Sequence, residues 1–114
     1  MEGLEVARRV VDAASDKQAS NIVLLDVREL CTFTDFFVIC SGDSERQLRT
    51  ILDEVGERLK RESVTPHHEE GTLDSGWLLL DYGDVVAHIF SSAERERYRL
   101  EDLWRDARTV LRVQ

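Results

Sequence analysis

Hydrophobic and polar positions follow two different periods along the chain, and the change of period separates predicted helices from predicted strands. Near the amino terminus, apolar residues recur every three or four positions, which predicts an amphipathic helix over residues 3–16. Two continuous apolar runs of strand length follow, NIVLLDV at 21–27 and FFVIC at 36–40. Continuous apolar runs are typical of central strands that have neighbours on both sides.

A second helix is expected directly after the FFVIC run. Ser44, followed three residues later by Gln47, matches a capping box, and an apolar stripe at helical spacing then continues to about Arg61. The segment 62–76 contains the only proline and two of the six glycines, and it predicts a short strand near His67 followed by a surface loop. Apolar residues at helical spacing within 91–110 predict one or two further helical segments.

Between the loop and the last helices lies WLLLDYGDVVAHIF, residues 77–90, which predicts a β-hairpin. Gly83-Asp84 suits a two-residue type II′ turn, which would pair Trp77 with Phe90. Because side chains alternate along a strand, one face of the hairpin is almost purely apolar and should lie in the core. The opposite face carries Trp77, Leu79, Asp81, Val86, His88 and Phe90.

This order of elements predicts an α/β fold in one domain, residues 1–114. The simplest arrangement is a single mixed β-sheet of about five strands with helices mainly on one face. With few helices for so many strands, part of the second sheet face should stay uncovered.

The mixed face of the hairpin has the composition of an interface core, in which aromatic anchors surround a few polar groups. Asp81 and His88 would be diagonal neighbours there, close enough to interact. The alternative is equally compatible with the pattern: a helix, the C-terminal one for example, covers this face and its residues are structural.

The net charge of the chain indicates which kind of partner the mixed face could bind. The chain has 15 Lys and Arg against 23 Asp and Glu, a net charge of −8, so its surface repels phosphate backbones and suits a basic protein better than nucleic acid. Basic residues in the second helix are expected to form a solvated helix face. No apolar run approaches the ~20 residues that a membrane helix requires, and the first 17 residues lack the apolar region of a secretory signal, so the expected location is cytoplasmic.

Candidate chemistry is sparse, and the expected result is a protein without enzymatic activity, cofactor or metal. Asp81 and Asp84 are three residues apart across a turn and do not converge on one ion. The run at His67–Glu70 alternates faces, so only two of its four side chains could meet a metal. Cys31 and Cys40 are expected to be free thiols in a reducing compartment. The loop SGDS at 41–44 lies between a strand and a helix but lacks the motifs of nucleotide-binding loops.

Four ordered blocks of the sequence resemble the ribosomal silencing factor family, the Iojap-related proteins, over nearly the whole chain. The blocks are TDFFVICSGDSERQ at 34–47, EG followed by tryptophan at 70, 71 and 77, LLDYGDVVAHIF at 79–90, and YRLEDLWRDA at 98–107. Two positions depart from the family pattern, the small Ala87 and the charged Arg97.

The resemblance implies a nucleotidyltransferase-like topology without the catalytic carboxylates. It also implies binding to the large ribosomal subunit through ribosomal protein L-fourteen, steric blocking of the small subunit, and reduced translation when nutrients are short. Free members can form a homodimer. We therefore expect the mixed face to bind the ribosomal protein through apolar contacts of Trp77, Leu79, Val86 and Phe90. Asp81 and His88 would supply polar contacts, and Glu70 would add one at the rim. The alternative is a nucleotide-binding regulator or a ribosome-assembly factor of the same fold.

Overall fold

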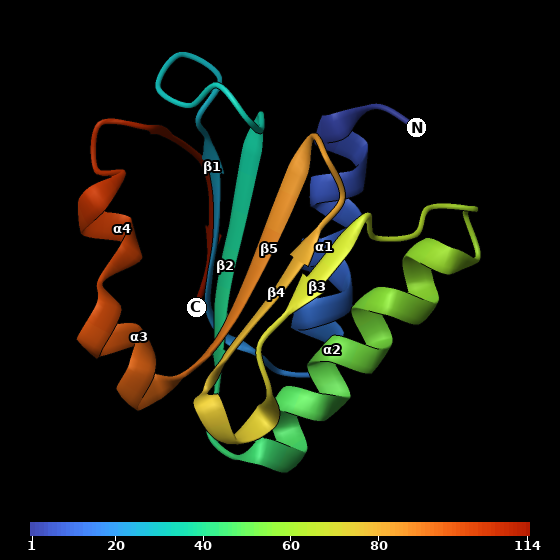
Figure 1. Ribbon diagram of the computed structural model, residues 1–114, viewed down its shortest axis with the longest axis vertical. Helices are drawn as coiled ribbons and strands as arrows, with labels where there is room; N and C mark the ends of the chain where they lie inside the picture. Colours follow the sequence, from blue (N-terminus) through green and yellow to red (C-terminus); the bar gives the residue numbers. More distant parts are fainter.

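The computed structural model describes residues 1–114 and shows one six-stranded mixed sheet with four α-helices (Figure 1). The strands are β1 (Ser20–Asp26), β2 (Phe36–Gly42), β3 (His68–Glu70), β4 (Trp77–Asp81), β5 (Val85–Ser91) and β6 (Arg108–Val113). The helices are α1 (Gly3–Asp16), α2 (Glu45–Lys60), α3 (Ser92–Tyr98) and α4 (Leu100–Leu103), with a 3₁₀ turn, η1, at Leu73–Ser75. None of the helices has the length and apolar character to cross a bilayer.

The strand order across the sheet is β3-β4-β5-β2-β1-β6. β2 and β5 are parallel, and every other neighbouring pair is antiparallel. The predicted α/β class with a single mixed sheet is therefore confirmed, although the sheet has six strands rather than about five.

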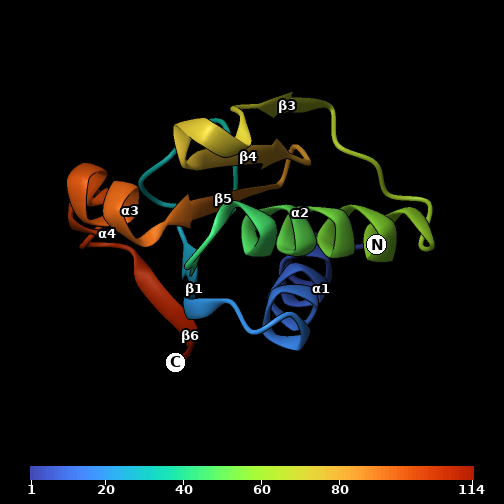
Figure 2. The ribbon, with the colours of Figure 1, turned by 90° about the horizontal axis from the view of Figure 1, so that it is seen from below.

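The two long helices, α1 and α2, pack side by side on one face of the sheet (Figure 2). The larger core lies beneath them and contains 22 buried residues, whereas the cluster on the opposite face contains eight. The short helices α3 and α4 lie on that opposite side (Figure 1). The prediction that helices lie mainly on one face is confirmed.

The hairpin forms with the predicted register. Trp77 pairs with Phe90 and Asp81 with Val86, and Tyr82 N–H donates to the carbonyl oxygen of Val85 at 2.8 Å, so the loop consists of Gly83 and Asp84. Gly83 has a φ of +87°, which a type II′ turn requires at its first central residue and which glycine adopts without strain. The apolar face of the hairpin lies in the larger core, as predicted.

The structure of the C-terminal segment differs in part from its prediction. The sequence predicts one or two helical segments within 91–110, and two short helices are found, but Arg108–Val113 forms β6 and pairs with β1 instead of continuing the helical pattern. Thr109, Val110 and Val113 are β-branched, and such residues favour a strand. The strand lies at an edge of the sheet and is only partly buried, so its apolar pattern is weak.

The predicted capping of α2 is half confirmed. Ser44 is the N-cap residue, and its Oγ accepts a hydrogen bond from Gln47 N–H at 3.1 Å. Gln47 Oε1, however, accepts from Asp43 N–H at 2.7 Å, one residue before the position of a standard capping box.

Replacing Ser44 with alanine should lower the free energy of unfolding by about 1 kcal/mol, because the first turn of α2 loses its side-chain acceptor. Urea unfolding followed by far-UV circular dichroism measures the change. Ser44→Asp is the matched control, since a carboxylate can accept the same bond, and it should retain wild-type stability. Equal losses in both variants would show that the cap contributes little.

Candidate functional site

All seven residues predicted to bind a partner lie on the sheet face opposite α1 and α2, which we call the aromatic face. Pairing across the strands places side chains in rows on a common face. One row runs from Glu70 through Leu79 and His88 to Ile39. Trp77 and Phe90 form a parallel row, and Asp81 and Val86 form another.

Burial divides this set into an accessible part and a supporting part. Trp77, Leu79 and Asp81 are half-buried, and Glu70 is exposed at the β3 edge. Val86 and His88 are buried, and Phe90 has none of its surface exposed, so in this structure they offer little contact area. In the free chain they support the accessible residues from the centre of the sheet, and their direct contact with a partner stays a prediction.

The covering side chains come from the C-terminal segment. The ring of Tyr98 in α3 lies 4.6 Å from the Trp77 ring and 6.3 Å from the Phe90 ring, measured between centroids. The Trp104 ring, just after α4, lies edge-on to the Phe37 ring at 5.2 Å. The aromatic face is thus covered over its centre and open at β3 and β4. The sequence left two alternatives, an open interface and a face covered by the C-terminal helix, and each describes part of the structure.

The orientation of Trp77 is fixed by three neighbours. Its ring stacks on Phe90 at 5.0 Å and lies against Tyr98, and its Nε1–H donates a hydrogen bond to His88 Nδ1 at 3.2 Å. Aromatic pairs of this kind are worth about 0.5–1.5 kcal/mol beyond area burial. A half-buried tryptophan held in one orientation is a preorganised contact for a partner.

His88 is a buried neutral imidazole. Burial lowers its pKa to about 4, because the charged form is poorly solvated among aromatic rings. Since Nδ1 accepts the indole hydrogen bond, the ring proton lies on Nε2, which has no hydrogen-bond partner. Asp81 and His88 are diagonal neighbours, as predicted, but their hydrogen bonds go elsewhere: Asp81 Oδ1 accepts from Gly83 N–H at 2.8 Å and stabilises the hairpin loop.

A groove opens beside Trp77 at the uncovered edge. It has a volume of about 290 Å³ and is lined by Glu70, Gly71, Ser75, Trp77, Leu79 and Tyr98. Gly71 has a φ of +92°, and a Cβ atom there would lie 1.9 Å from the carbonyl oxygen of Trp77, so only glycine fits. Gly71, Ser75 and Tyr98 are lining residues that were not among the predicted site residues. Tyr98 could not be found from the sequence, because its approach to Trp77 depends on the path of α3.

The side chain of Arg95 holds α3 over the sheet. It is mostly buried and forms a two-bond ion pair with Glu101, with both distances 3.0 Å. Its Nη1 donates to Ser41 Oγ at 2.7 Å and to the carbonyl oxygen of Ser20 at 3.3 Å. Arg95 thereby links α3, α4 and the ends of β1 and β2, and it fixes the position of Tyr98 on the same helix.

The SGDS loop does not form a free phosphate-binding site around Ser41. A polar cavity of about 400 Å³ lies beside Ser41, but the guanidinium of Arg95 in its wall is already bonded to Glu101 and to Ser41 itself. Three arginines and three acidic residues line this cavity, so it has no excess of positive charge to attract an anion.

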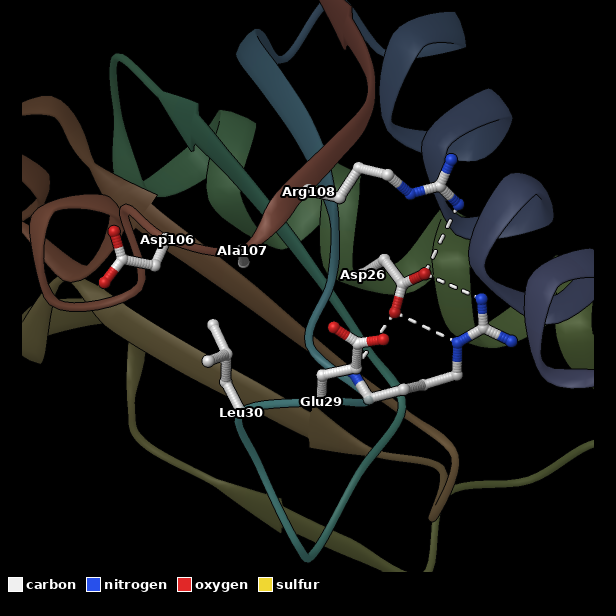
Figure 3. A pocket seen from close by; sticks show the side chains of 7 residues that line it. Asp26, Glu29, Leu30, Asp106, Ala107 and Arg108 are labelled. Carbon is white, nitrogen blue, oxygen red and sulfur yellow. Dashed lines mark hydrogen bonds and ion pairs between the residues drawn. The ribbon is translucent and has the colours of Figure 1, made fainter.

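A second polar cavity, of about 370 Å³, lies at the far end of β1 and β6 (Figure 3). The Asp26 carboxylate accepts hydrogen bonds from Arg28 at 2.7 and 3.0 Å and from Arg108 at 3.3 Å. The bond from Arg28 is the main reason why the pKa of Asp26 lies well below its usual range. Since Asp26 engages both arginines, we interpret this cluster as a link between β6 and the rest of the sheet.

The other chemical candidates have structural partners. His68 Nε2 lies 2.8 Å from Glu70 Oε1, and this hydrogen bond raises the pKa of His68. No group of three or more His, Cys, Asp or Glu side chains has the arrangement of a metal site. Both cysteines are free and buried, and burial raises the pKa of the Cys40 thiol to about 12, which makes it inert.

Comparison with known proteins shows the family of this chain. The sequence profile described as "RsfS: Ribosomal silencing factor during starvation" matches residues 1–114. The chain belongs to the ribosomal silencing factor family. It is 38% identical to a protein named ribosomal silencing factor RsfS from Halalkalibacterium halodurans. The match extends over 110 residues and covers 96% of this chain and 94% of that protein. The chloroplastic Iojap protein of Zea mays is 34% identical and covers 96% of this chain, which spans 47% of the plant protein.

Solved structures show the same fold in relatives. A crystal structure of a protein from Chromobacterium violaceum superposes with a TM-score of 0.87 at 33% identity, covering 91% of this chain and 87% of that one. A crystal structure from Bacillus halodurans gives a TM-score of 0.82 at 36% identity, with 95% and 98% covered. The family membership expected from the four sequence blocks is therefore confirmed.

Proposed function

We propose that this member of the silencing factor family binds the large ribosomal subunit through ribosomal protein L-fourteen and sterically prevents the small subunit from joining. Translation would then fall when nutrients are short. The observation that supports the proposal most strongly is the open edge of the aromatic face, where Trp77 stands half-buried beside Leu79 and Asp81 with Glu70 at the rim. Membership of a family described as silencing ribosomes supports the choice of partner.

The composition of this edge suits a basic protein. Trp77 and Leu79 supply apolar contact area, and a central tryptophan is a frequent hot spot of interfaces. The net charge of −8 attracts a basic partner and disfavours direct binding to ribosomal RNA. The proposed activity needs no catalytic group, cofactor or metal, because occupancy and bulk are sufficient to block subunit joining. Its place of action is the cytoplasm, where ribosomes assemble.

A homodimer of the free protein is a further part of the proposal. Two copies could cover the open edge of the aromatic face until one is exchanged for the ribosome. Sedimentation equilibrium of the free protein, alone and with large subunits, tests whether self-association and ribosome binding exclude one another.

Replacing Trp77 with alanine should weaken binding to large subunits by about thirtyfold, or about 2 kcal/mol, because the central aromatic contact is lost. Co-sedimentation with purified large subunits over a range of protein concentrations gives the two dissociation constants. Leu103→Ala is the matched control: Leu103 is an apolar residue on α4 with 74% of its surface exposed, outside the groove, and its loss should leave binding unchanged.

Far-UV circular dichroism must show that the Trp77→Ala protein is folded, since this variant also loses the contacts with Phe90 and His88. Trp77→Phe retains an aromatic ring and should recover part of the affinity. Wild-type binding by a folded Trp77→Ala protein would move the interface away from the aromatic face. Failure of the wild type to bind large subunits would refute the proposed function itself.

A further inference from the structure

The groove beside Trp77 has the dimensions of a receptor for one side chain. Its volume of about 290 Å³ is at or below the lower limit of small-molecule pockets, which have volumes of about 300–1,000 Å³. It is open to solvent between the β3 edge of the sheet and Tyr98 of α3, so a protruding side chain can enter it from a partner that docks on the aromatic face.

Its walls combine aromatic rings with a carboxylate. The rings of Trp77 and Tyr98 lie 4.6 Å apart at an angle of 50°, and Glu70 lines the groove. A cation placed over the face of a tryptophan or tyrosine ring is attracted by the negative face of the ring. The structure already contains one such contact, because the guanidinium carbon of Arg97 lies 5.7 Å from the centroid of the Tyr98 ring.

No basic residue lines the groove itself, and the cationic groups beside its walls are Arg97, over the Tyr98 ring, and His68, bonded to Glu70. The internal partner of Glu70 is His68, and both side chains of this pair are more than half exposed. Exposed pairs of this kind contribute only about 0–1 kcal/mol, so a second cation can take over the carboxylate at little cost.

We propose that this groove receives one arginine side chain of the protein to which the aromatic face binds. The guanidinium plane would lie against Trp77 and Tyr98, and Glu70 would accept its hydrogen bonds. Arginine is favoured over lysine because its planar, weakly hydrated guanidinium both stacks on aromatic rings and pairs with a carboxylate. An aliphatic side chain would desolvate Glu70 without compensation, and a phosphate group would be repelled by it. The identity of the partner rests on the proposed function, whereas the preference of the groove for a guanidinium does not.

The first test uses the protein alone with acetyl-arginine amide as the probe and acetyl-citrulline amide as its neutral isostere. The indole N–H signals of Trp77 and Trp104 are followed by nuclear magnetic resonance and assigned with Trp104→Phe. The proposal predicts that the arginine probe shifts the Trp77 signal in a saturable manner, that the citrulline probe causes a much smaller shift, and that Trp104 is unaffected. Equal shifts from both probes, or no shift of Trp77 up to 100 mM, would overturn it.

Two glutamates of β3 provide matched variants. Glu70 lies in the row of Leu79 on the aromatic face, whereas Glu69 pairs with Leu80 and projects to the opposite face, so Glu70→Gln and Glu69→Gln remove the same charge from opposite sides. Both residues are exposed, and neither change should affect folding. Glu70→Gln should weaken arginine binding by about three- to fivefold, and Glu69→Gln should leave it unchanged.

The same pair of variants, measured for co-sedimentation with large subunits, separates this inference from the proposed function. A three- to fivefold loss of affinity for Glu70→Gln, with Glu69→Gln at wild-type affinity, supports the arginine receptor. Wild-type binding by both variants overturns it and leaves the proposed function standing. Saturable arginine binding by a wild-type protein that ignores large subunits refutes the proposed function and retains the groove as a guanidinium site.

Discussion

Replacement of Phe90 with alanine is expected to lower the free energy of unfolding by about 3–5 kcal/mol, the usual cost of deleting a fully buried phenylalanine ring. Phe90 has none of its surface exposed, and it stacks against Trp77 at 5.0 Å and contacts Tyr98 at 6.3 Å. Its removal leaves a cavity beneath α3, the helix that carries Tyr98 over the aromatic face. The midpoint of urea unfolding should fall accordingly, with little change in the denaturant slope.

Phe33→Ala is the matched control because it deletes the same ring at a position that is 70% exposed. Its effect on the free energy of unfolding should be within about 0.5 kcal/mol. If Phe90→Ala lowered the free energy of unfolding as little as Phe33→Ala does, Phe90 would not be packed beneath α3 in solution as it is in this structure.

The second large effect is a loss of stability in acid caused by His88. Its pKa is about 4 in the folded chain and 6.5 in its ordinary state. Between these values the unfolded chain takes up a proton at this position and the folded chain does not. The free energy of unfolding therefore decreases as the pH falls from 6.5 to 4, by about 3 kcal/mol in total.

His88→Gln removes the titrating group and can keep an acceptor for the indole hydrogen bond of Trp77. The difference in free energy of unfolding between this variant and the wild type should change by about 3 kcal/mol from pH 7 to pH 4, because contributions from the carboxylates cancel. His67→Gln, on the exposed β3 edge, is the control and should parallel the wild type. A pH-independent difference for His88→Gln would show that His88 is not buried as a neutral base.

The hairpin shows how much of the fold follows from local sequence. The turn pair Gly83-Asp84 determines the register, and alternation then determines which side chains share a face, so all the pairs from Trp77–Phe90 to Asp81–Val86 could be predicted. The long helices could also be predicted from local sequence. Ser44 marks the start of α2, and the apolar stripe continues along it. These features depend on interactions within a few residues or across one turn.

The features that were missed depend on contacts between distant parts of the chain. β6 forms because the tail pairs with β1, about 80 residues earlier, as in the contact of Arg108 with Asp26. The cover over Phe90 and His88 depends on Arg95, whose partners Ser20 and Ser41 lie in other strands. No local pattern shows that α3 turns back over the sheet, and so the division of the aromatic face into a buried centre and an open edge could not be predicted from the sequence.

This division changes which residues are available to a partner without moving the proposed site. Trp77, Leu79, Asp81 and Glu70 remain accessible, and Tyr98 joins them at the groove. Val86, His88 and Phe90 support them from below. The accessible part of the proposed interface is therefore smaller than the sequence suggested.

The most direct test of the account is light scattering of subunit joining after the protein has been incubated with purified large subunits. Addition of small subunits should then give a signal that falls as the protein concentration rises and approaches zero near one protein per large subunit. At the same concentrations Trp77→Ala should leave a larger signal than the wild type, because its affinity is about thirtyfold lower. A full signal with wild-type protein at concentrations at which it co-sediments with large subunits would contradict the account, because the protein would then occupy the subunit without blocking its partner.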